Sequence, residues 1–556
     1  MFVRLFLGLA MLTASSQAYV RTMSSTGRAL YWPTPSITMQ GNPTNSSGLS
    51  QAQVSSMLGD SFATWQLSGT RVGLGYSQST GNPTHSGIDG VNAVYFASAG
   101  GRSMDWGVVA LTEVLYYVSS GQITEADMVF NDNQFLFTAN QGDTGTSQNG
   151  RTAIYLRDVA THEAGHVLGL DHSLVNLSSL IFTAFSGQYS LSGDDSNAIR
   201  TMYPSGGSSG GAMSGVVAGT NGGIFGAHLT AVNLLTGKVE AGILASSNGS
   251  FRLGDVPAGR YAVMMEPFGT DVSSVSSYYQ NVNHRFCSYN NFRRRFYSDC
   301  NGTGAISVMG VSAGSSTSLG TLAPSCSQMG NPGGEPTSIA AAKAISNQGG
   351  AAFGTLTPGA VHYYVVHNVS GALSARVMSY SLYSPVDVKV NILDANGNAV
   401  AGSTSVDNVD SPGPGGVVNY DSLATANVAS GDYVIQITSS SSTIPSTKYS
   451  AGFDLLDNDG HYLVALAVNG DINPTALTDM SSCVSVNNVP QSASYQDYVA
   501  PAQKQKSAGC GVISNGSAGG PFFGGMMQVL TVALLLQLLS MAIRNRRQRV
   551  LARHRR

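Results

Sequence analysis

Residues 161–173 read THEAGHVLGLDHS, and three histidines at fixed spacing dominate this stretch. His162 and His166 are four residues apart, which on a helix places both imidazoles on one face. Gly169 permits the left-handed conformation with which many helices end, so the chain can turn back and bring His172 to the same place. Three neutral imidazole nitrogens suit zinc and leave a fourth position open for water, as in catalytic rather than structural sites. The spacing therefore predicts a zinc site.

The stretch is similar to the long zinc signature of the metzincin peptidases, and Ser173 after the third histidine resembles their matrixin (M10-type) branch. LSGDD at residues 191–195 and IRTMYP at residues 199–204 fit the same branch. The resemblance covers residues 31–204 and implies an α+β catalytic domain with a twisted mixed sheet and three helices. Calcium is a second candidate cofactor beside Zn²⁺. The apolar residues of 174–185 are expected to wall the substrate pocket.

This resemblance also implies an activity. It makes His162, His166 and His172 the zinc ligands, and Glu163 the general base that takes a proton from water and returns it to the leaving amine. The expected function is a zinc-dependent metalloendopeptidase that hydrolyses extracellular proteins, with protein or peptide substrates as partners. A surface adhesion or binding protein with a degenerate peptidase domain is the alternative, because Leu180 stands where matrixins have the methionine of their Met-turn.

Local patterns around the motif favour an α+β domain over residues 19–204. Apolar residues at helical spacing behind Ser50 predict a helix over residues 51–66, and a second helix is expected over about 153–168. A third begins near Ser192, which forms a capping box with Asp195. The strand-like runs between the helices are residues 71–75, 93–97 and 126–130.

Two all-β modules are expected downstream, because strand patterns there alternate with Gly and Asn turns. Residues 212–325 resemble carboxypeptidase-regulatory-like domains, through motifs such as VPAGRY at residues 256–261. Residues 337–471 resemble the bacterial pre-peptidase C-terminal domain, through landmarks such as DANG at residues 394–397. Both resemblances imply a β-sandwich. The Gly-rich linkers ahead of the modules are residues 205–211 and 326–336.

The N-terminus has the pattern of an export signal. Residues 1–18 carry one cation, Arg4, then an apolar run and a small-residue end at Ala18, which predicts a secretory signal peptide; a buried first helix is the alternative. Export permits disulfides, and Cys287 with Cys300 are the pair closest in sequence. Connectivity among the five cysteines stays open.

The C-terminus combines three features. Residues 472–521 are polar and read as a stalk that contains Cys510, and residues 522–543 carry no charge and are long enough to form a transmembrane helix. The Arg-rich residues 544–556 are placed in the cytoplasm by the positive-inside rule. The combination resembles the sorting tails of Gram-negative surface proteins, which implies processing near Cys510 at the cell envelope or outer surface. A plain membrane anchor is the alternative.

Charge is distributed unevenly. Removing the seven arginines of residues 544–556 changes the formal net charge from −3 to −10, and removing Arg4 makes it −11. A net acidic exported chain argues against nucleic-acid binding. One stretch differs, because Arg293, Arg294 and Arg295 lie among aromatic residues and could grip an anionic envelope polymer; a solvated loop is the alternative.

Overall fold

The computed structural model describes residues 19–480 with gaps, together with the backbone of residues 504–509. The predicted signal peptide, the predicted membrane helix, the Arg-rich tail, Cys287, Cys300 and Cys510 lie outside the described residues. Among the described residues, no helix is both long and apolar enough to cross a membrane. The gaps are residues 80, 82, 85–87, 177, 181–187, 207–209, 220–221, 269–274, 277, 280–291, 299–305, 326–333, 358, 385, 410–418, 444–459 and 478–479, and the side chains of residues 440–443 are also not described.

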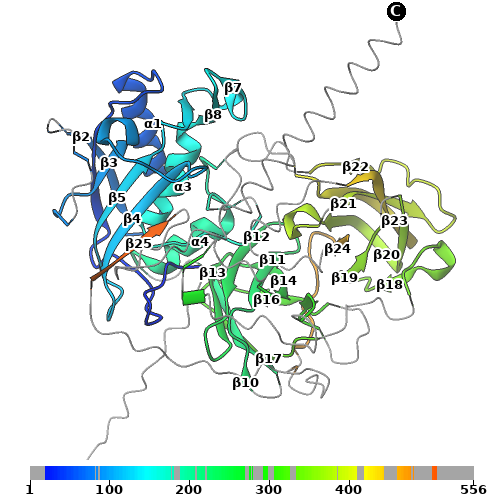
Figure 1. Ribbon diagram of the computed structural model, residues 1–556. Helices are drawn as coiled ribbons and strands as arrows, with labels where there is room; N and C mark the ends of the chain where they lie inside the picture. Colours follow the sequence, from blue (N-terminus) through cyan, green and yellow to red (C-terminus); the bar gives the residue numbers. More distant parts are fainter. Residues whose placement is uncertain are drawn as a thin grey trace, which may run out of the picture.

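The described chain is mostly β structure with few helices, arranged in three regions (Figure 1). The first region is built on a mixed sheet with the strand order β2-β1-β3-β5-β4-β25. Strands β1, β2, β3 and β5 run parallel, whereas β4 is antiparallel to β5. The strands are β1 (Ser36–Gly41), β2 (Gly73–Gln78), β3 (Ala93–Phe96), β4 (Ala110–Tyr117), β5 (Ile123–Phe130) and β25 (Lys504–Gly509).

Strand β25 differs from the expectation of an irregular stalk over residues 472–521. Its backbone pairs antiparallel with the edge strand β4, in a register that sets Lys504 opposite Tyr117 and Gly509 opposite Thr112. An edge strand offers a row of backbone donors and acceptors to any extended segment that reaches it. The pairing is not visible in the sequence, because about 390 residues separate the two strands.

The three predicted helices of the first region are present. The capping boxes Ser50–Gln53 and Ser192–Asp195 begin the first and the last of them. The middle helix begins at Leu156 rather than near residue 153, because residues 151–155 form a strand instead. The helices are α1 (Gln51–Thr64), the single turn α2 (Ala97–Gly100), α3 (Leu156–Val167) and α4 (Gly193–Met202), and a small sheet holds β6 (Phe135–Thr138), β7 (Ser147–Gln148) and β8 (Arg151–Tyr155).

The second region consists of two sheets that pack against each other. One sheet has the order β10-β9-β13 with β17 also on β9, and the other has the order β12-β11-β14-β15 with β16 also on β14. The strands are β9 (Gly211–Gly219), β10 (Gly222–Gly223), β11 (His228–Asn233), β12 (Val239–Leu244), β13 (Ser250–Val256), β14 (Gly259–Glu266), β15 (Arg295–Phe296), β16 (Met309–Val311) and β17 (Ser316–Leu322).

The third region forms a single hydrogen-bonded sheet, ordered β19-β24-β20-β23-β21 with β18 and β22 attached to it. Strand β20 is long enough to pair with β18 near one end and with β24 near the other, and its register shifts between Val366 and Gly371. The strands are β18 (Lys343–Ile345), β19 (Gly350–Thr355), β20 (Val361–Met378), β21 (Val386–Asp394), β22 (Thr404–Val406), β23 (Ser422–Thr443) and β24 (His461–Val468). Short 3₁₀ turns lie at η3 (Ile339–Ala341) and η4 (Tyr380–Leu382) in this region, and at η1 (Gln141–Asp143) in the first region.

Tight packing joins the first and second regions. Helix α4 packs on β12 and β13, and one cluster of buried apolar side chains runs from the first region into both sheets of the second. The described part of the expected flexible linker, residues 205–211, is held at both ends: Ser205 N–H donates to Gly69 O, and Gly210 N–H donates to Asp255. Both described ends of this Gly- and Ser-rich linker are therefore hydrogen-bonded to the neighbouring regions.

Candidate metal centre

Helix α3 presents two of the three motif histidines and ends where the sequence predicts. Gly169 has φ +92°, and its N–H donates to His166 O at 2.9 Å. A Cβ at this position would lie 2.8 Å from Leu30 O, so a side chain is excluded by space as well as by conformation. The left-handed Gly169 is confirmed. It turns the chain so that His172 comes back beside α3.

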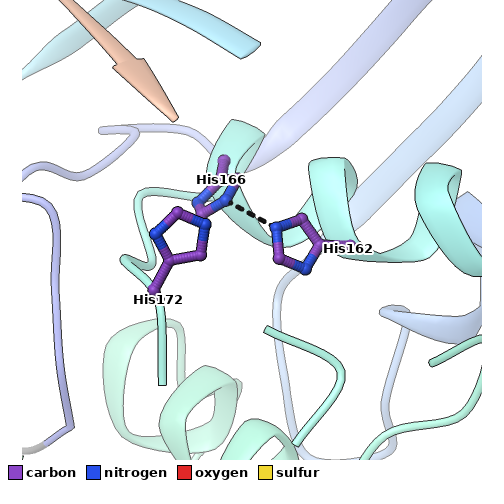
Figure 2. A group of neighbouring side chains, drawn as sticks. All are labelled: His162, His166 and His172. Carbon is purple, nitrogen blue, oxygen red and sulfur yellow. Dashed lines mark hydrogen bonds between the residues drawn. The ribbon is translucent and has the colours of Figure 1, made fainter. Parts of the chain in front are cut away.

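The three imidazoles are buried and face one another (Figure 2). Their candidate ligand atoms all lie within 4.8 Å of one another, and the Nε2 atoms of His162 and His166 are 3.1 Å apart. Two nitrogens that bind one zinc at about 2.1 Å in tetrahedral geometry are separated by about 3.4 Å. The spacing of the ring nitrogens therefore fits a single zinc ion.

Backbone carbonyls fix how two of these rings are oriented. Nδ1 of His162 lies 2.9 Å from Ser179 O, and Nδ1 of His166 lies 2.9 Å from Leu170 O. A carbonyl oxygen only accepts, so Nδ1 carries the proton and Nε2 keeps its lone pair in both rings. Two facing lone pairs repel unless a cation binds both. Burial, followed by the neighbouring His166, lowers the pKa of His162 to about 3, which keeps that ring neutral for a metal.

Glu163 lies beside the histidines as a fully buried carboxylate. The Thr112 hydroxyl, from β4, donates to Glu163 Oε2 at 2.6 Å and fixes the orientation of the carboxylate. Fifty-one residues separate the pair, and no local pattern marks Thr112. The contact is therefore not predictable from the sequence.

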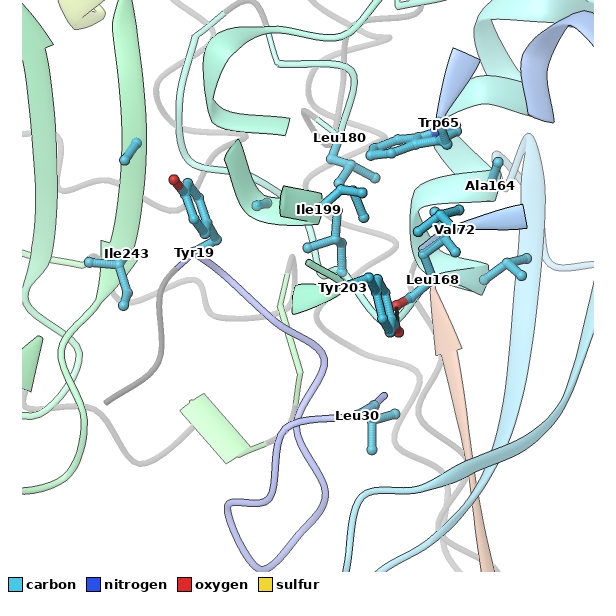
Figure 3. Packing of buried hydrophobic residues seen from close by; sticks show 14 of the residues in the cluster. Tyr19, Leu30, Trp65, Val72, Ala164, Leu168, Leu180, Ile199, Tyr203 and Ile243 are labelled. Carbon is cyan, nitrogen blue, oxygen red and sulfur yellow. Dashed lines mark hydrogen bonds between the residues drawn. The ribbon is translucent and has the colours of Figure 1, made fainter. Parts of the chain in front are cut away.

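Leu180 is 2% exposed and lies beside Trp65, in the core next to α3 (Figure 3). Its peptide oxygen accepts from Ser173 N–H at 3.0 Å, which ties it to the residue after His172. A Cβ on Gly165 of α3 would lie 2.7 Å from a Leu180 methyl carbon, so the helix and this side chain are in close contact. The apolar support expected at the Met-turn position is present, although it is leucine.

Two adjacent carboxylates of α4 hold the chain around the centre. Asp195 accepts from Ser178 Oγ at 2.6 Å and from Ser179 N–H at 2.8 Å. Asp194 accepts from Ser173 Oγ at 2.6 Å and from Gly242 N–H of β12 at 2.7 Å. The capping-box pattern predicts only the helix-capping role of Asp195, and these contacts around the histidines are additional.

Some of the residues expected to wall the substrate pocket are buried in the core instead. Leu174 packs in a cluster with residues of the second region, and Val175 packs in a cluster that reaches the third. Together with Leu180 they are buried, so these three side chains are core and not pocket wall. The remaining apolar residues of that stretch, Leu177 and those of 181–185, lie outside the described residues.

The basic stretch is not a free charged surface. Arg294 is 3% exposed, and its guanidinium forms an ion pair with Glu266 at 2.7 Å. Arg295 lies in β15 and donates to Ala323 O, and Arg293 N–H donates to Ser325 O. The expectation of a polymer grip is wrong for Arg294, because burying an arginine requires a partner that uses its charge.

A metal-compatible group of three or more His, Cys, Asp or Glu side chains occurs once in the described part of the chain, and it is the histidine trio. No described group corresponds to the calcium expected as a second cofactor.

Replacing Leu180 tests the packing beneath the histidines. Leu180→Ala is expected to lower the free energy of unfolding by about 2–5 kcal/mol, because it leaves a cavity against α3. Leu180→Met keeps the volume and should cost less than about 1.5 kcal/mol. Chemical denaturation of the full chain measures both, and equal losses in the two variants would contradict this packing role.

Asp194 gives a pH prediction. Burial, then the neighbouring Asp195, raises the pKa of Asp194 from 3.8 to about 7. Between about pH 4 and 7 the folded state keeps a proton that the unfolded state has released, so stability falls as pH rises through this window, by at most about 4 kcal/mol. Asp194→Asn should flatten this fall. Denaturation curves at pH 4, 5.5 and 7 measure it, and identical slopes in the two proteins would contradict the assignment.

Comparisons with known proteins bear on the first region. None of the curated proteins matches the chain. Among solved structures, the major pilin subunit BcpA of Bacillus cereus is 10% identical over 42% of this chain and 58% of its own, with a TM-score of 0.12. The secreted serine protease VesC of Vibrio cholerae is 11% identical over 47% of this chain and 49% of its own, with a TM-score of 0.13. The chain thus spans less than two thirds of either protein, and likenesses this weak carry no argument.

The family comparison is specific. The matrixin family model matches residues 32–204, which include α3, the three histidines, Leu180 and α4. Residues 32–204 therefore match the matrixins, a family of zinc-dependent metallopeptidases.

Proposed function

We propose that the protein is a zinc-dependent endopeptidase in which His162, His166 and His172 bind the metal. One observation carries the proposal. Three buried, neutral imidazoles converge beside the buried carboxylate of Glu163, within the residues that match the matrixin family model. A buried carboxylate beside a metal site serves naturally as a proton acceptor and donor in hydrolysis.

The residues around the metal centre have different roles in the proposed hydrolysis. When bound, zinc supplies Lewis-acid activation of water and of the scissile carbonyl. Glu163 takes the proton of the attacking water and returns it to the leaving amine. Thr112 supports this role, because its hydroxyl bond at 2.6 Å holds the carboxylate in one orientation. Ser179 O and Leu170 O keep the His162 and His166 rings turned toward the metal.

Peptides are the substrate class that the neighbouring sheet favours. Strand β4 carries Thr112 and accepts β25 as an antiparallel partner along its edge. Extended peptides bind sheet edges by the same main-chain hydrogen bonds. A segment on this edge pairs with Thr112, whose hydroxyl contacts Glu163, and this arrangement supports cleavage of extended polypeptide chains.

Glu163→Gln tests the proposal. The amide cannot accept the proton, so hydrolysis of casein or gelatin is expected to fall by at least about 100-fold. Zinc content, measured by atomic emission, should stay at one ion per chain, because Glu163 is not a ligand. Asp60→Asn on the exposed face of α1 is the control and should keep full activity.

A chelator separates the two functions considered. Cleavage by the unaltered protein should stop with 1,10-phenanthroline, at a concentration of about 1 mM in excess over the metal, and return with added zinc. A pure adhesion protein with a degenerate domain would bind no zinc or would cleave nothing before chelation, and either result would exclude the peptidase.

We also propose that the enzyme is exported and acts at the bacterial envelope or outer surface. The support is sequence alone: the signal pattern of residues 1–18 and the tail of residues 472–556. Mass spectrometry of the native protein should find Tyr19 as the first residue and no peptide from residues 544–556. Retention of those arginines would leave a plain membrane anchor instead of a processed tail.

A further inference from the structure

The segment that carries the third histidine is held by other parts of the chain rather than by a helix. Residues 171–176, here named the His172 loop, follow the end of α3. His162 and His166 are fixed by the hydrogen bonds of α3, whereas His172 depends on what its loop contacts. Within the described residues, those contacts reach the second and third regions.

The first contact runs through Asp171. Its Oδ1 accepts the backbone N–H of His172 at 2.8 Å. Its Oδ2 accepts the N–H of Ser276, in the second region, at 2.8 Å, and also the Ser276 hydroxyl. Ser276 Oγ in turn accepts from Met23 N–H at 3.1 Å. The carboxylate therefore connects the peptide of a metal ligand directly to the second region.

The second contact runs through Asp194. Its two oxygens accept from Ser173 Oγ and from Gly242 N–H, so it joins the loop to strand β12. A Cβ on Gly242 would lie 2.4 Å from Val175 Cγ2. Strand β12 and the loop thus meet so closely that a side chain at position 242 would force Val175 to move.

Apolar packing and one further hydrogen bond complete the enclosure. Leu174 packs with Phe225, Leu244 and other side chains of the second region. Asn176 Nδ2 donates to Tyr380 O of the third region at 2.6 Å. The other residues of the loop therefore each contact the second region, the third region or α4, and the His172 ring lies against those of His162 and His166 (Figure 2).

We propose that the second and third regions form part of the metal centre, because they position His172 through the His172 loop, with Ser276 and Gly242 as positioning residues. The inference rests on the proposed zinc peptidase. Metal ligands must be held within a few tenths of an ångström of their productive position, and groups that orient them affect metal affinity about 10- to 100-fold. The downstream regions thus act on zinc binding.

Ser276→Ala in the full-length protein tests the Asp171 contact. Loss of the hydroxyl is expected to weaken zinc binding about 10-fold in competition with a chromophoric chelator, and to change the visible spectrum of the cobalt(II) form. Ser276→Thr keeps the hydroxyl and should restore both. Arg260→Gln is the matched control, because it breaks an inter-region ion pair, with Asp471 between the second and third regions, that lies away from the loop.

Gly242→Ala tests the close approach independently. The added methyl must displace Val175, so kcat and the cobalt spectrum should change together while KM changes little. Gly206→Ala, where nothing lies within 4 Å of the added carbon, is its control. Circular dichroism checks that each variant is folded.

Two results would overturn the inference: unchanged zinc affinity and cobalt spectrum in both Ser276→Ala and Gly242→Ala, or equal losses in the Arg260→Gln control. Failure of the proposed function looks different. In that case the unaltered protein cleaves nothing although Ser276→Ala still binds zinc more weakly than it does.

Discussion

Three neutral imidazoles must face one point inside a buried space, and much of the first region serves that constraint. The Nδ1 atoms of His162 and His166 are committed to peptide oxygens, so their Nε2 lone pairs converge at 3.1 Å. The repulsion between these lone pairs raises the free energy of the folded state when no cation is bound, and cation binding removes it. The ends of α3, the turn at Gly169 and the apolar support from Leu180 all follow from this need to hold the lone pairs together.

Helix α4 connects that constraint to the rest of the chain. One carboxylate, Asp195, holds the turn under the histidines, and the next, Asp194, holds both the loop after His172 and strand β12. Adjacent residues on a helix point in different directions, so a single Asp-Asp pair can serve two partners. The cost is the burial of two neighbouring carboxyl groups, which is what raises the pKa of Asp194.

Local chemistry was readable from the sequence, and long-range contacts were not. The helix caps at Ser50 and Ser192, the left-handed Gly169 and the clustering of the histidines each depend on residues within about a dozen positions of one another, and the structure has them as expected. Other contacts join residues far apart in the chain, and no periodicity or motif in the sequence predicts them. They are the hydrogen bonds of Thr112 and Ser276 and the pairing of β25 with β4. Arg294 is the opposite case. The cluster of cations predicts an exposed charged surface, but Arg294 is buried and pairs with Glu266, which lies 28 residues away at the end of β14.

The apolar cluster shared by the first and second regions sets where this chain can be divided. Tyr19 and Ile243 belong to one core with Ile199, although sequence motifs place them in separate modules (Figure 3). A cut after residue 204 would expose that core to water on both fragments, at about 25 cal/mol for every Å² uncovered. The segment that matches the matrixin family and the cooperative folding unit are therefore different parts of the chain. Limited proteolysis or recombinant truncation at the family boundary would yield an incomplete unit rather than a minimal enzyme.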